Sequence, residues 1–464
     1  MSEQESLWSS LKEAVHGSHQ DFTEGSINRA VLLLAVPMVL ETMMESVFAV
    51  VDIFWVSHLG ASAIATVGLT EAMLTLLYAI AIGLCMGAGA TVARRVGEKN
   101  MEGASIAAVQ AIAMGLGLSI PIALFGGLLA PHLLAWMGAS SDVVQIGTGY
   151  TRIMFAGNAT ILLLWLVNAI FRGAGDAAIA MRVLWLANWI NILLGPCLIF
   201  GLGPFPKLGV AGASIATNIG RGTGVLYQLY RLTRKDGRLQ IYKRHLVLQW
   251  DVIKSMFRIS GTGIVQSLIG MTSWIGLIRI LSSFGSPAVA GYTIGIRIII
   301  FALLPSWGLS NAAATLVGQN LGAGKPDRAE QSVWITCRNN LFFLGVIGAA
   351  FIVLAPQIIS LFIQDTSVSP YAIQCLRIVS AGFLFYAYGM VVTQAFNGAG
   401  DTWTPTMINM FCYWLFEIPI GYLLAKQAGF GPSGVFIAIT FAFSLLAVVS
   451  VILFRRGRWK LRKV

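Results

Sequence analysis

Charged side chains are scarce in this 464-residue chain. They make up 11% of its residues, whereas hydrophobic residues make up 56% and the mean hydropathy is +0.76. Ordinary soluble domains carry about 25% charged residues, so this chain has too few to cover a surface in water. That shortage excludes a soluble enzyme, a nucleic-acid-binding protein and a disordered scaffold. An all-α integral membrane protein remains, and the 50 glycines and 14 prolines agree with it, because both residues are more frequent in membrane-spanning helices than in soluble ones.

Residues suited to metal or thiol chemistry are also few. The five cysteines lie in apolar stretches without a CxxC spacing, so we expect neither a disulfide framework nor a zinc site. The five histidines lie near the ends of apolar stretches or in the tails, which argues against a histidine metal centre at membrane depth. We expect no bound cofactor. The first thirty residues are polar and lack the apolar core of a signal peptide, and residues 7–15 are compatible with a short interfacial helix.

Apolar runs of about 20 residues, the length that crosses a bilayer, recur twelve times. They cover approximately 31–57, 64–93, 104–130, 146–171, 179–202, 208–231, 252–281, 286–317, 327–354, 371–396, 404–427 and 431–455. The sequence therefore predicts an N-terminal segment (1–30), an N lobe (31–231), a linker (232–251), a C lobe (252–455) and a basic tail (456–464).

The loops differ in positive charge, which predicts the orientation. One set of connections holds Arg94, Arg95, Lys99, Arg172, Arg231, Arg234, Lys235, Arg238, Lys243, Arg244, Lys325, Arg328 and the tail from Arg455 to Lys463. The opposite set holds only Lys207 and Lys426. Lys and Arg accumulate in cytoplasmic loops, so we expect both termini in the cytoplasm of a multi-pass protein of the plasma membrane, the inner membrane of a bacterium.

The two halves repeat at a constant offset of 225 residues. The offset aligns Gly60 with Gly285, Gly83 with Gly308, Gly97 with Gly322, Pro131 with Pro356, Arg152 with Arg377, Gly157 with Gly382, and Gly209 with Gly434. The longest match is Phe171-Arg-Gly-Ala-Gly-Asp176 against Phe396-Asn-Gly-Ala-Gly-Asp401. Six spans per repeat give both lobes the same orientation, about a two-fold axis along the membrane normal, as in some secondary transporters. In such transporters a cavity between the lobes opens alternately to either side.

Acidic side chains inside the spans are the strongest functional signal, because a charge at the bilayer centre costs at least about 2.5–3.5 kcal/mol on insertion scales. They are Glu41, Glu45, Asp52, Glu71 and Glu417. Four of them belong to the N lobe, and the repeat offset pairs each with an uncharged residue, which for Glu41 is Gln266. We therefore predict that ion coupling resides mainly in the N lobe.

Three of these carboxylates form one stripe on the first span. At about 100° per residue, Glu41, Glu45 and Asp52 lie on one face, with Phe48 between them. Carboxylates crowded in a low dielectric can exchange protons near neutral pH, and the same oxygens suit Na⁺, with Asp52 as its candidate ligand. Four asparagines of the fourth and fifth spans could complete such a site, namely Asn158, Asn168, Asn188 and Asn191. The structural alternative is that these polar groups bond one another and hold the helices together.

Several further residues are candidates for contact with a substrate. We assign this role to Glu71, Gln266, Glu417 and Phe48. The arginines within spans, Arg221, Arg297 and Arg338, are interpreted as charge partners of carboxylates or of a cytoplasmic vestibule. Aromatic residues of the spans could bind flat organic cations through cation–π contact.

Taken together, these motifs resemble those of the MATE (multidrug and toxic compound extrusion) transporters over nearly the whole chain. The similar features are Pro37, Val51-Asp52, Val96-Gly97, Val317-Gly318-Gln319-Asn320 and the twin loops Arg172-Gly-Ala-Gly-Asp176 and Asn397-Gly-Ala-Gly-Asp401. The resemblance implies outward antiport of drugs or organic cations, driven by H⁺ or Na⁺, through alternating access.

Within that family the chain is most similar to the DinF-like branch, whose N-lobe site centres on the first-span aspartate, here Asp52. Other branches use acidic residues in spans seven and ten, but here span seven has Gln266 and span ten has no acidic residue. The branch usually shows Asn-x-x-x-Asp-Pro in span five, whereas this chain has Asn191-Ile-Leu-Leu-Gly195-Pro196. We hypothesise that Glu41 or Glu45 compensates for the carboxylate that Gly195 lacks.

Three other functions are weighed against antiport. A flippase for a lipid-linked or amphipathic substrate predicts a basic cavity, and the acidic N lobe counts against it. A membrane enzyme needs a catalytic constellation at membrane depth, and the sequence shows none. Two repeats that rock against each other are typical of a carrier and less typical of a channel. The expected partners are therefore small organic cations or drugs and membrane lipid, without nucleic acid or an obligate protein partner, in a monomer.

Overall fold

The computed structural model describes residues 7–18, 20–234 and 237–462, and their regular structure is helical throughout. The predicted positions 1–6, Lys235 and Lys463 lie outside the described residues. The α-helices are α1 (Leu7–His16), α2 (Ile27–Ser57), α3 (Ala61–Gly97), α4 (Met101–Leu128), α5 (Ala130–Trp136), α6 (Ser141–Ala156), α7 (Asn158–Gly173), α8 (Ala177–Phe200), α9 (Val210–Thr233), α10 (Trp250–Ser282), α11 (Ser286–Gly322), α12 (Pro326–Ser360), α13 (Ser369–Ser380), α14 (Phe383–Gly398), α15 (Trp403–Asn409), α16 (Ile418–Tyr422) and α17 (Pro432–Arg455). Short 3₁₀ or π stretches are η1 (Lys243–His245), η2 (Met410–Glu417), η3 (Leu423–Gln427) and η4 (Arg458–Leu461).

The helices reproduce the predicted series of twelve spans. Nine helices of the described chain are long and apolar enough to cross a bilayer, and two bent pairs, α6 with α7 and α13 with α14, raise the number to eleven. The twelfth is α9, which has 24 residues and packs along α8. Its lower hydropathy follows from polar residues such as Arg221 on the face turned toward the protein.

The fourth and tenth spans are bent, which the apolar runs alone did not reveal. The bends are 41° between α6 and α7 and 60° between α13 and α14. They fall at Gly157 and at Gly382, two glycines that the repeat offset aligns. A side chain at Gly157 would collide with the Asn218 amide, so glycine lets the bent span pack closely against α9.

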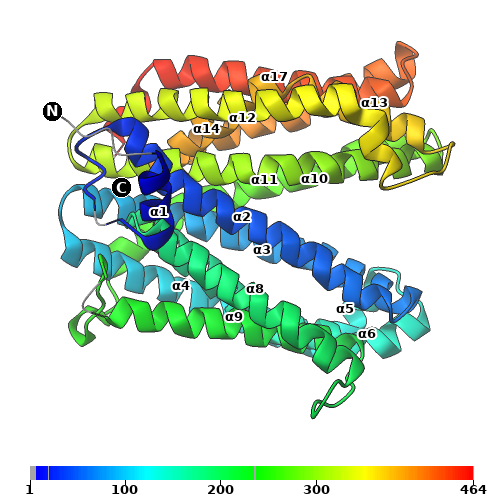
Figure 1. Ribbon diagram of the computed structural model, residues 1–464, viewed down its shortest axis with the longest axis horizontal. Coiled ribbons are helices and arrows are strands. Elements are labelled where there is room, and N and C mark those ends of the chain that lie inside the picture. Colours follow the sequence, from blue (N-terminus) through cyan, green and yellow to red (C-terminus); the bar gives the residue numbers. More distant parts are fainter. Residues whose placement is uncertain (1–6, 19, 235–236, 463–464) are drawn as a thin grey trace.

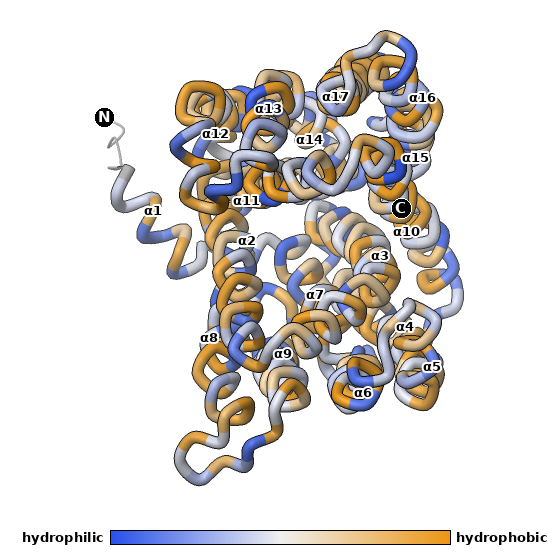
Figure 2. The backbone as a smooth tube through the Cα atoms, turned by 90° about the vertical axis from the view of Figure 1, so that its right-hand side faces the viewer, coloured by the Kyte–Doolittle hydropathy of each residue, from blue (hydrophilic) through white to orange (hydrophobic). Residues whose placement is uncertain are grey.

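The helices form two bundles, the N lobe (α2–α9) and the C lobe (α10–α17), which Figure 1 shows one below the other. Both chain termini lie at the same end of the bundles, here called the terminus end (Figure 1). Viewed along the bundles, α2 lies beside α11 and α3 beside α10 (Figure 2). The first helix of each lobe therefore packs against the second helix of the other, as a two-fold axis requires.

Glycines of the repeat make equivalent crossings between the lobes. A Cβ at Gly83 of α3 would lie 2.5 Å from the Ile264 backbone nitrogen of α10, and one at Gly308 of α11 would lie 2.6 Å from the Met38 carbonyl oxygen of α2. These two glycines are repeat partners. Only a residue without a side chain allows backbones to approach so closely.

At the terminus end, α3 and α11 meet directly on the two-fold axis. A Cβ at Gly97 would collide with the Gln319 carbonyl, and a Cβ at Gly322 would collide with the Arg94 carbonyl. The repeat aligns Gly97 with Gly322 and Arg94 with Gln319. The two contacts are therefore equivalent, with the roles of α3 and α11 exchanged. In addition, Gln319 Nε2 donates to the Gly173 carbonyl at 2.9 Å. The Val-Gly and Val-Gly-Gln-Asn motifs therefore hold the lobes together at this end.

The polar segments at the terminus end are docked against the bundles. The linker packs on α4, where Ser105 donates to the Gln240 carbonyl at 2.7 Å. Residues Asp21–Gly25, which precede α2, contact Lys99 of the N lobe and Lys325 and Arg328 of the C lobe. These five residues, here called the strap, thus join both lobes.

Candidate functional site

The acidic stripe of α2 faces the interior of the N lobe, as its spacing predicted. Its side chains contact α3, α7, α8 and α9, and a central cavity between the lobes reaches its terminus-end half. The stripe divides into an inner group around Glu41 and an outer group around Glu45 and Asp52.

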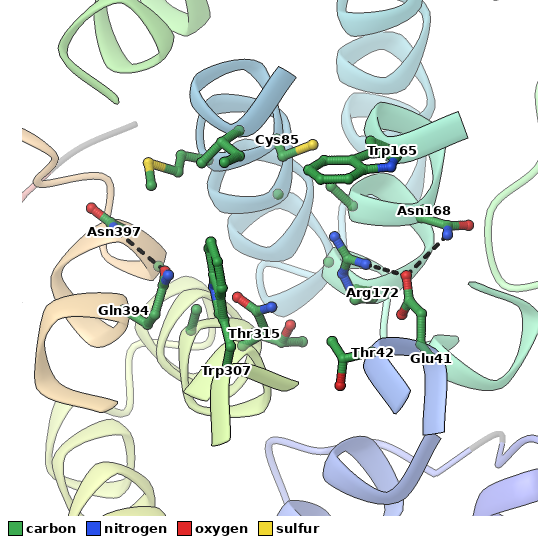
Figure 3. Close-up of a pocket in the computed structure, with 18 of the residues that line it drawn as sticks. Glu41, Thr42, Cys85, Trp165, Asn168, Arg172, Trp307, Thr315, Gln394 and Asn397 are labelled. Carbon is green, nitrogen blue, oxygen red and sulfur yellow. Dashed lines mark hydrogen bonds and ion pairs between the residues drawn. The ribbon is translucent and has the colours of Figure 1, made fainter. Parts of the chain in front are cut away.

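The inner group is built on Glu41, which is 6% exposed. Its Oε1 accepts hydrogen bonds from Arg172 Nη1 at 2.6 Å and from Asn168 Nδ2 at 3.0 Å, both on α7 (Figure 3). Gln228 of α9 orients this asparagine by donating to Asn168 Oδ1 at 2.7 Å. Glu41 Oε2 is buried without a hydrogen-bond partner among the described residues. One oxygen of this carboxylate thus accepts two hydrogen bonds while the other accepts none from the described residues.

Arg172 occupies a different place from the one predicted. The loop-charge pattern assigned it to the positive connections, but it lies in the last turn of α7 and its side chain turns inward to Glu41. The physical reason is that a buried carboxylate without a charge partner is costly, and the end of α7 brings a guanidinium within reach.

The outer group surrounds Arg221 of α9, which is buried. Its Nη2 lies 3.7 Å from Glu45 Oε1, and its guanidinium lies over the Phe48 ring at 5.6 Å from the centroid. Asn188 Nδ2 donates to Glu45 Oε2 at 3.2 Å. The interpretation of Arg221 as a charge partner of carboxylates is therefore confirmed, and Phe48 packs beneath this charge.

Asp52 and Glu71 complete the outer group. Both lie close enough to Arg221 to interact with its charge, and they also interact with each other. Glu71 Oε2 accepts a hydrogen bond from Tyr78 at 3.3 Å. The two groups together bring four carboxylates near two guanidiniums, those of Arg172 and Arg221. With every group ionised, this interior would hold a surplus of two negative charges, which two protons or two monovalent cations would neutralise.

Two of the predicted asparagines do not touch the carboxylates. Asn191 Nδ2 donates to Thr217 Oγ1 at 2.7 Å. Asn158 Nδ2 donates to the carbonyls of Ser119 and Phe155, at 3.0 and 2.7 Å. Among the described residues, both amides therefore act in helix packing, and their assignment to ion coupling remains a prediction.

Gly195 lies beside the outer group. A Cβ atom added at Gly195 would lie 4.0 Å from its nearest neighbours, Asn191 Oδ1 and Trp55 Cδ1. Trp55 follows Asp52 by one helical turn of α2, so the fold leaves room for the carboxylate that the resemblance leads one to expect at this position.

The predicted C-lobe residues lie apart from the acidic stripe. Gln266 of α10 is 5% exposed, and its Oε1 has no hydrogen-bond partner among the described residues. Glu417 is 2% exposed at the end of the π-helical stretch η2. Arg297 is exposed on α11, and Arg338 donates to Asn28 Oδ1 at 3.1 Å near the terminus end.

Two adjoining cavities lie between and beside the lobes. The inner cavity, of about 210 Å³, is lined by α2, α3, α7, α8, α11 and α14 and includes Glu41 and Glu45. A cavity of about 690 Å³ extends into the C lobe and includes Gln266. The residues that line both are Ile82, Met86, Leu304, Trp307 and Gln394. The acidic cavity and the apolar, aromatic cavity thus lie side by side and share these five lining residues.

Sequence reasoning missed several residues of this site. Nothing in the sequence marked Tyr78, Gln228 and Gln394 as site residues, because the sequence around a polar residue in a helix does not show which residue it contacts. Arg172 and Asn397 could have been found from the sequence, since the twin loops match at every position except this pair. The structure places both on the wall of the inner cavity.

Comparisons with known proteins agree with this arrangement. The family model MatE matches residues 37–197 and 259–423, one stretch in each half. The probable multidrug resistance protein YoeA of Bacillus subtilis is 26% identical over 435 residues, which cover 92% of this chain and 94% of that protein. The probable multidrug resistance protein NorM of Thermotoga maritima is 24% identical over 449 residues, 94% of each chain.

A solved structure extends the likeness to three dimensions. The outward-facing conformation of a multidrug resistance MATE family transporter of the MOP superfamily superposes with a TM-score of 0.89 and 26% identity, covering 96% of this chain and 98% of that one. This likeness supports a transporter of twelve membrane helices in two lobes and not an enzyme. Since the family model covers most of the chain and both of its repeats, the chain belongs to the MATE family of membrane transporters.

Proposed function

We propose that this protein exports organic cations or drugs in exchange for H⁺ or Na⁺, with ion coupling at the N-lobe carboxylates. The observation that carries the proposal is the charge surplus around α2. Glu41, Glu45, Asp52 and Glu71 share two arginines, so their oxygens can bind a proton, a metal cation or an organic cation in turn. Exchange arises because the coupling ion and the organic cation compete for the same carboxylate oxygens.

We further propose alternating access between the two lobes in a bacterial inner membrane. The terminus end carries the positively charged connections and would face the cytoplasm. There the contacts of Gly97 with Gln319 and of Gly322 with Arg94 keep the lobes closed, while the lobes diverge toward the opposite end (Figure 1). These features support an outward-facing state. We expect a monomer surrounded by lipid, since both lobes come from one chain.

The first test measures transport in proteoliposomes with ethidium as a fluorescent cation. An H⁺ gradient and an Na⁺ gradient are imposed separately on wild type and on Asp52→Asn. We expect ethidium movement that follows one gradient in wild type and falls at least about tenfold in the variant, because the amide cannot carry the exchanged charge. Asp142→Asn, at an exposed position at the start of α6, is the matched control and should transport normally.

Two results would contradict the proposal. Gradient-driven transport that survives unchanged in Asp52→Asn would remove this residue from coupling. Absence of transport under both gradients would favour the rival flippase, which a fluorescent-lipid translocation assay on the same vesicles would detect. The acidic lining of the inner cavity, in which Arg172 is already paired with Glu41, disfavours a phosphate-bearing lipid head group.

A further inference from the structure

We propose that the inner cavity is a subsite for the nitrogen-bearing end of the cargo, where an organic cation with N–H donors binds Glu41 and Asn397 in competition with Arg172. The inference rests on the proposed export of organic cations and specifies which cations fit, which part of them enters first and what releases them.

Two buried acceptors of this cavity lack hydrogen-bond partners. They are Glu41 Oε2 and Asn397 Oδ1, on side chains that are 6% and 2% exposed, among the described residues. A buried acceptor without a donor costs about 1–3 kcal/mol. Both groups are acceptors, so a ligand that satisfies them must supply donors. A protonated amine, an amidine or an aromatic amine beside a ring nitrogen cation does so, whereas a quaternary phosphonium does not.

The two acceptors come from opposite lobes. Figure 3 shows Glu41 with Arg172 and Asn168 on one side of the cavity, and Asn397 with Gln394 on the other. Asn397 Nδ2 donates to Gln394 Oε1 at 3.2 Å, which leaves its oxygen free. Arg172 and Asn397 are repeat partners. The repeat therefore supplies a cation on the wall beside Glu41 and a neutral acceptor on the facing wall.

The two cavities differ in size, so each accommodates a different part of the cargo. Drug-sized ligands occupy pockets of about 300–1,000 Å³, so the inner cavity of about 210 Å³ holds a head group and not a whole drug. Its wall includes Trp165 and Trp307, whose ring faces can receive a cation. The adjoining cavity of about 690 Å³ is lined by Trp274, Met271 and other apolar side chains. The hydrophobic body of the cargo fits there.

Arg172 determines how tightly the head group is held. It bonds Glu41 Oε1 at 2.6 Å, so a bound cation must share this carboxylate with a guanidinium. Like charges on one carboxylate repel each other. The fold therefore contains a built-in competitor that weakens the bound state and favours release of the cargo.

The test is a double-mutant cycle on binding, measured in purified detergent-solubilised protein at pH 8 without any ion gradient. The variants are Glu41→Gln, Arg172→Gln, the double variant and Asn397→Leu, with Asp142→Asn as control. The probes are ethidium, which carries aromatic amines, and tetraphenylphosphonium, which has no N–H group. Thermal melting confirms that each variant is folded. The double variant removes both charges of the Glu41–Arg172 pair together, so it can be tested even if either single variant is unstable.

We expect Glu41→Gln and the double variant to weaken ethidium binding by at least about tenfold, and Arg172→Gln to tighten it. Asn397→Leu should weaken ethidium but leave tetraphenylphosphonium unchanged. The subsite is disproved if Glu41→Gln binds ethidium as wild type does, if Arg172→Gln fails to tighten binding, if Asn397→Leu affects both probes equally, or if wild type binds neither probe. Binding as expected together with failed transport under both gradients would leave the subsite standing and overturn only the proposed antiport.

Discussion

At the scale of single residues, the buried carboxylates of the two lobes differ in their surroundings. In the N lobe, Glu41 and Glu45 each have an arginine within ion-pair distance. In the C lobe, Glu417 is buried among aromatic side chains such as Tyr413, without a charged partner in the described part of the chain. An isolated ionised carboxylate in an apolar interior is strongly disfavoured, so an uncharged amide should suit the position of Glu417 at least as well.

This difference predicts the effect of Glu417→Gln. The amide has nearly the same shape and cannot ionise, so the variant should melt at the same temperature as wild type or higher. Glu41→Gln should instead melt lower, because it leaves Arg172 without its charge partner. Thermal unfolding of both variants in the same detergent measures this. If Glu417→Gln lost ethidium transport while remaining folded, the predicted contact of Glu417 with cargo would gain support, and unchanged transport would remove it.

At the scale of helices, glycine positions decide where elements can touch. The lobes cross at Gly83 and Gly308 and meet on the two-fold axis at Gly97 and Gly322. Without a hydrophobic force between helices inside a bilayer, close backbone packing is a main source of association. The glycines that recur in both halves of the sequence therefore mark helix contacts that recur in both lobes.

Gly97→Ala tests the contact on the axis. The added methyl group would collide with the Gln319 carbonyl, and overpacking of this kind costs about 1–3 kcal/mol. We expect a clearly lower melting temperature. Gly117→Ala is the matched control, because nothing lies within 4 Å of its Cβ position and glycine-to-alanine changes in helices otherwise stabilise by about 0.5–1 kcal/mol. Equal melting of the two variants would show that this contact carries no weight.

At the scale of the whole molecule, the strap connects the lobes at the terminus end. Lys325 Nζ donates to the Thr23 carbonyl at 3.0 Å, and Arg328 Nη1 donates to the Gly25 carbonyl at 2.9 Å, both from the C lobe. From the N lobe, Lys99 Nζ lies 3.7 Å from Asp21 Oδ2. Opening of the terminus end requires these bonds to lengthen or break, so the strap should favour the closed state.

The pH dependence of the strap follows from Asp21. Partial burial acts to raise the pKa of this carboxyl, but hydrogen bonds from the Thr23 side chain and backbone, together with the charges of Lys99 and Lys325, outweigh burial and hold the pKa below its ordinary value of 3.8. A carboxyl with a lowered pKa stabilises the fold above its unfolded value, and this contribution is lost as the pH falls through the folded value.

We therefore expect Asp21→Asn to lower the melting temperature at pH 7 by about 2 °C, as for a solvent-exposed ion pair. The difference from wild type should shrink as the pH falls below about 3.8. Melting curves of wild type, Asp21→Asn and the control Asp142→Asn across this pH range measure it. A difference that is absent at pH 7, or that grows in acid, would contradict the assignment.

Much of the fold could be predicted because its signals are local or periodic. Runs of apolar residues located the spans, since backbone groups in lipid must be satisfied within a helix. The constant offset revealed the two lobes, and the spacing of Glu41, Glu45 and Asp52 placed them on one face of α2. The bends at Gly157 and Gly382 escaped prediction, because a glycine in a helix is compatible with either a straight or a bent path.

The partners of the candidate site could not be predicted to the same extent. The sequence by itself determined that carboxylates lie at membrane depth in the N lobe, because helical spacing is a property of one segment. Only the tertiary structure decided that Arg172 turns inward to Glu41, that Arg221 lies among Glu45, Asp52 and Glu71, and that Asn158 bonds backbone carbonyls instead. Those contacts join residues far apart in the chain, and packing between helices, which no single segment encodes, selects them.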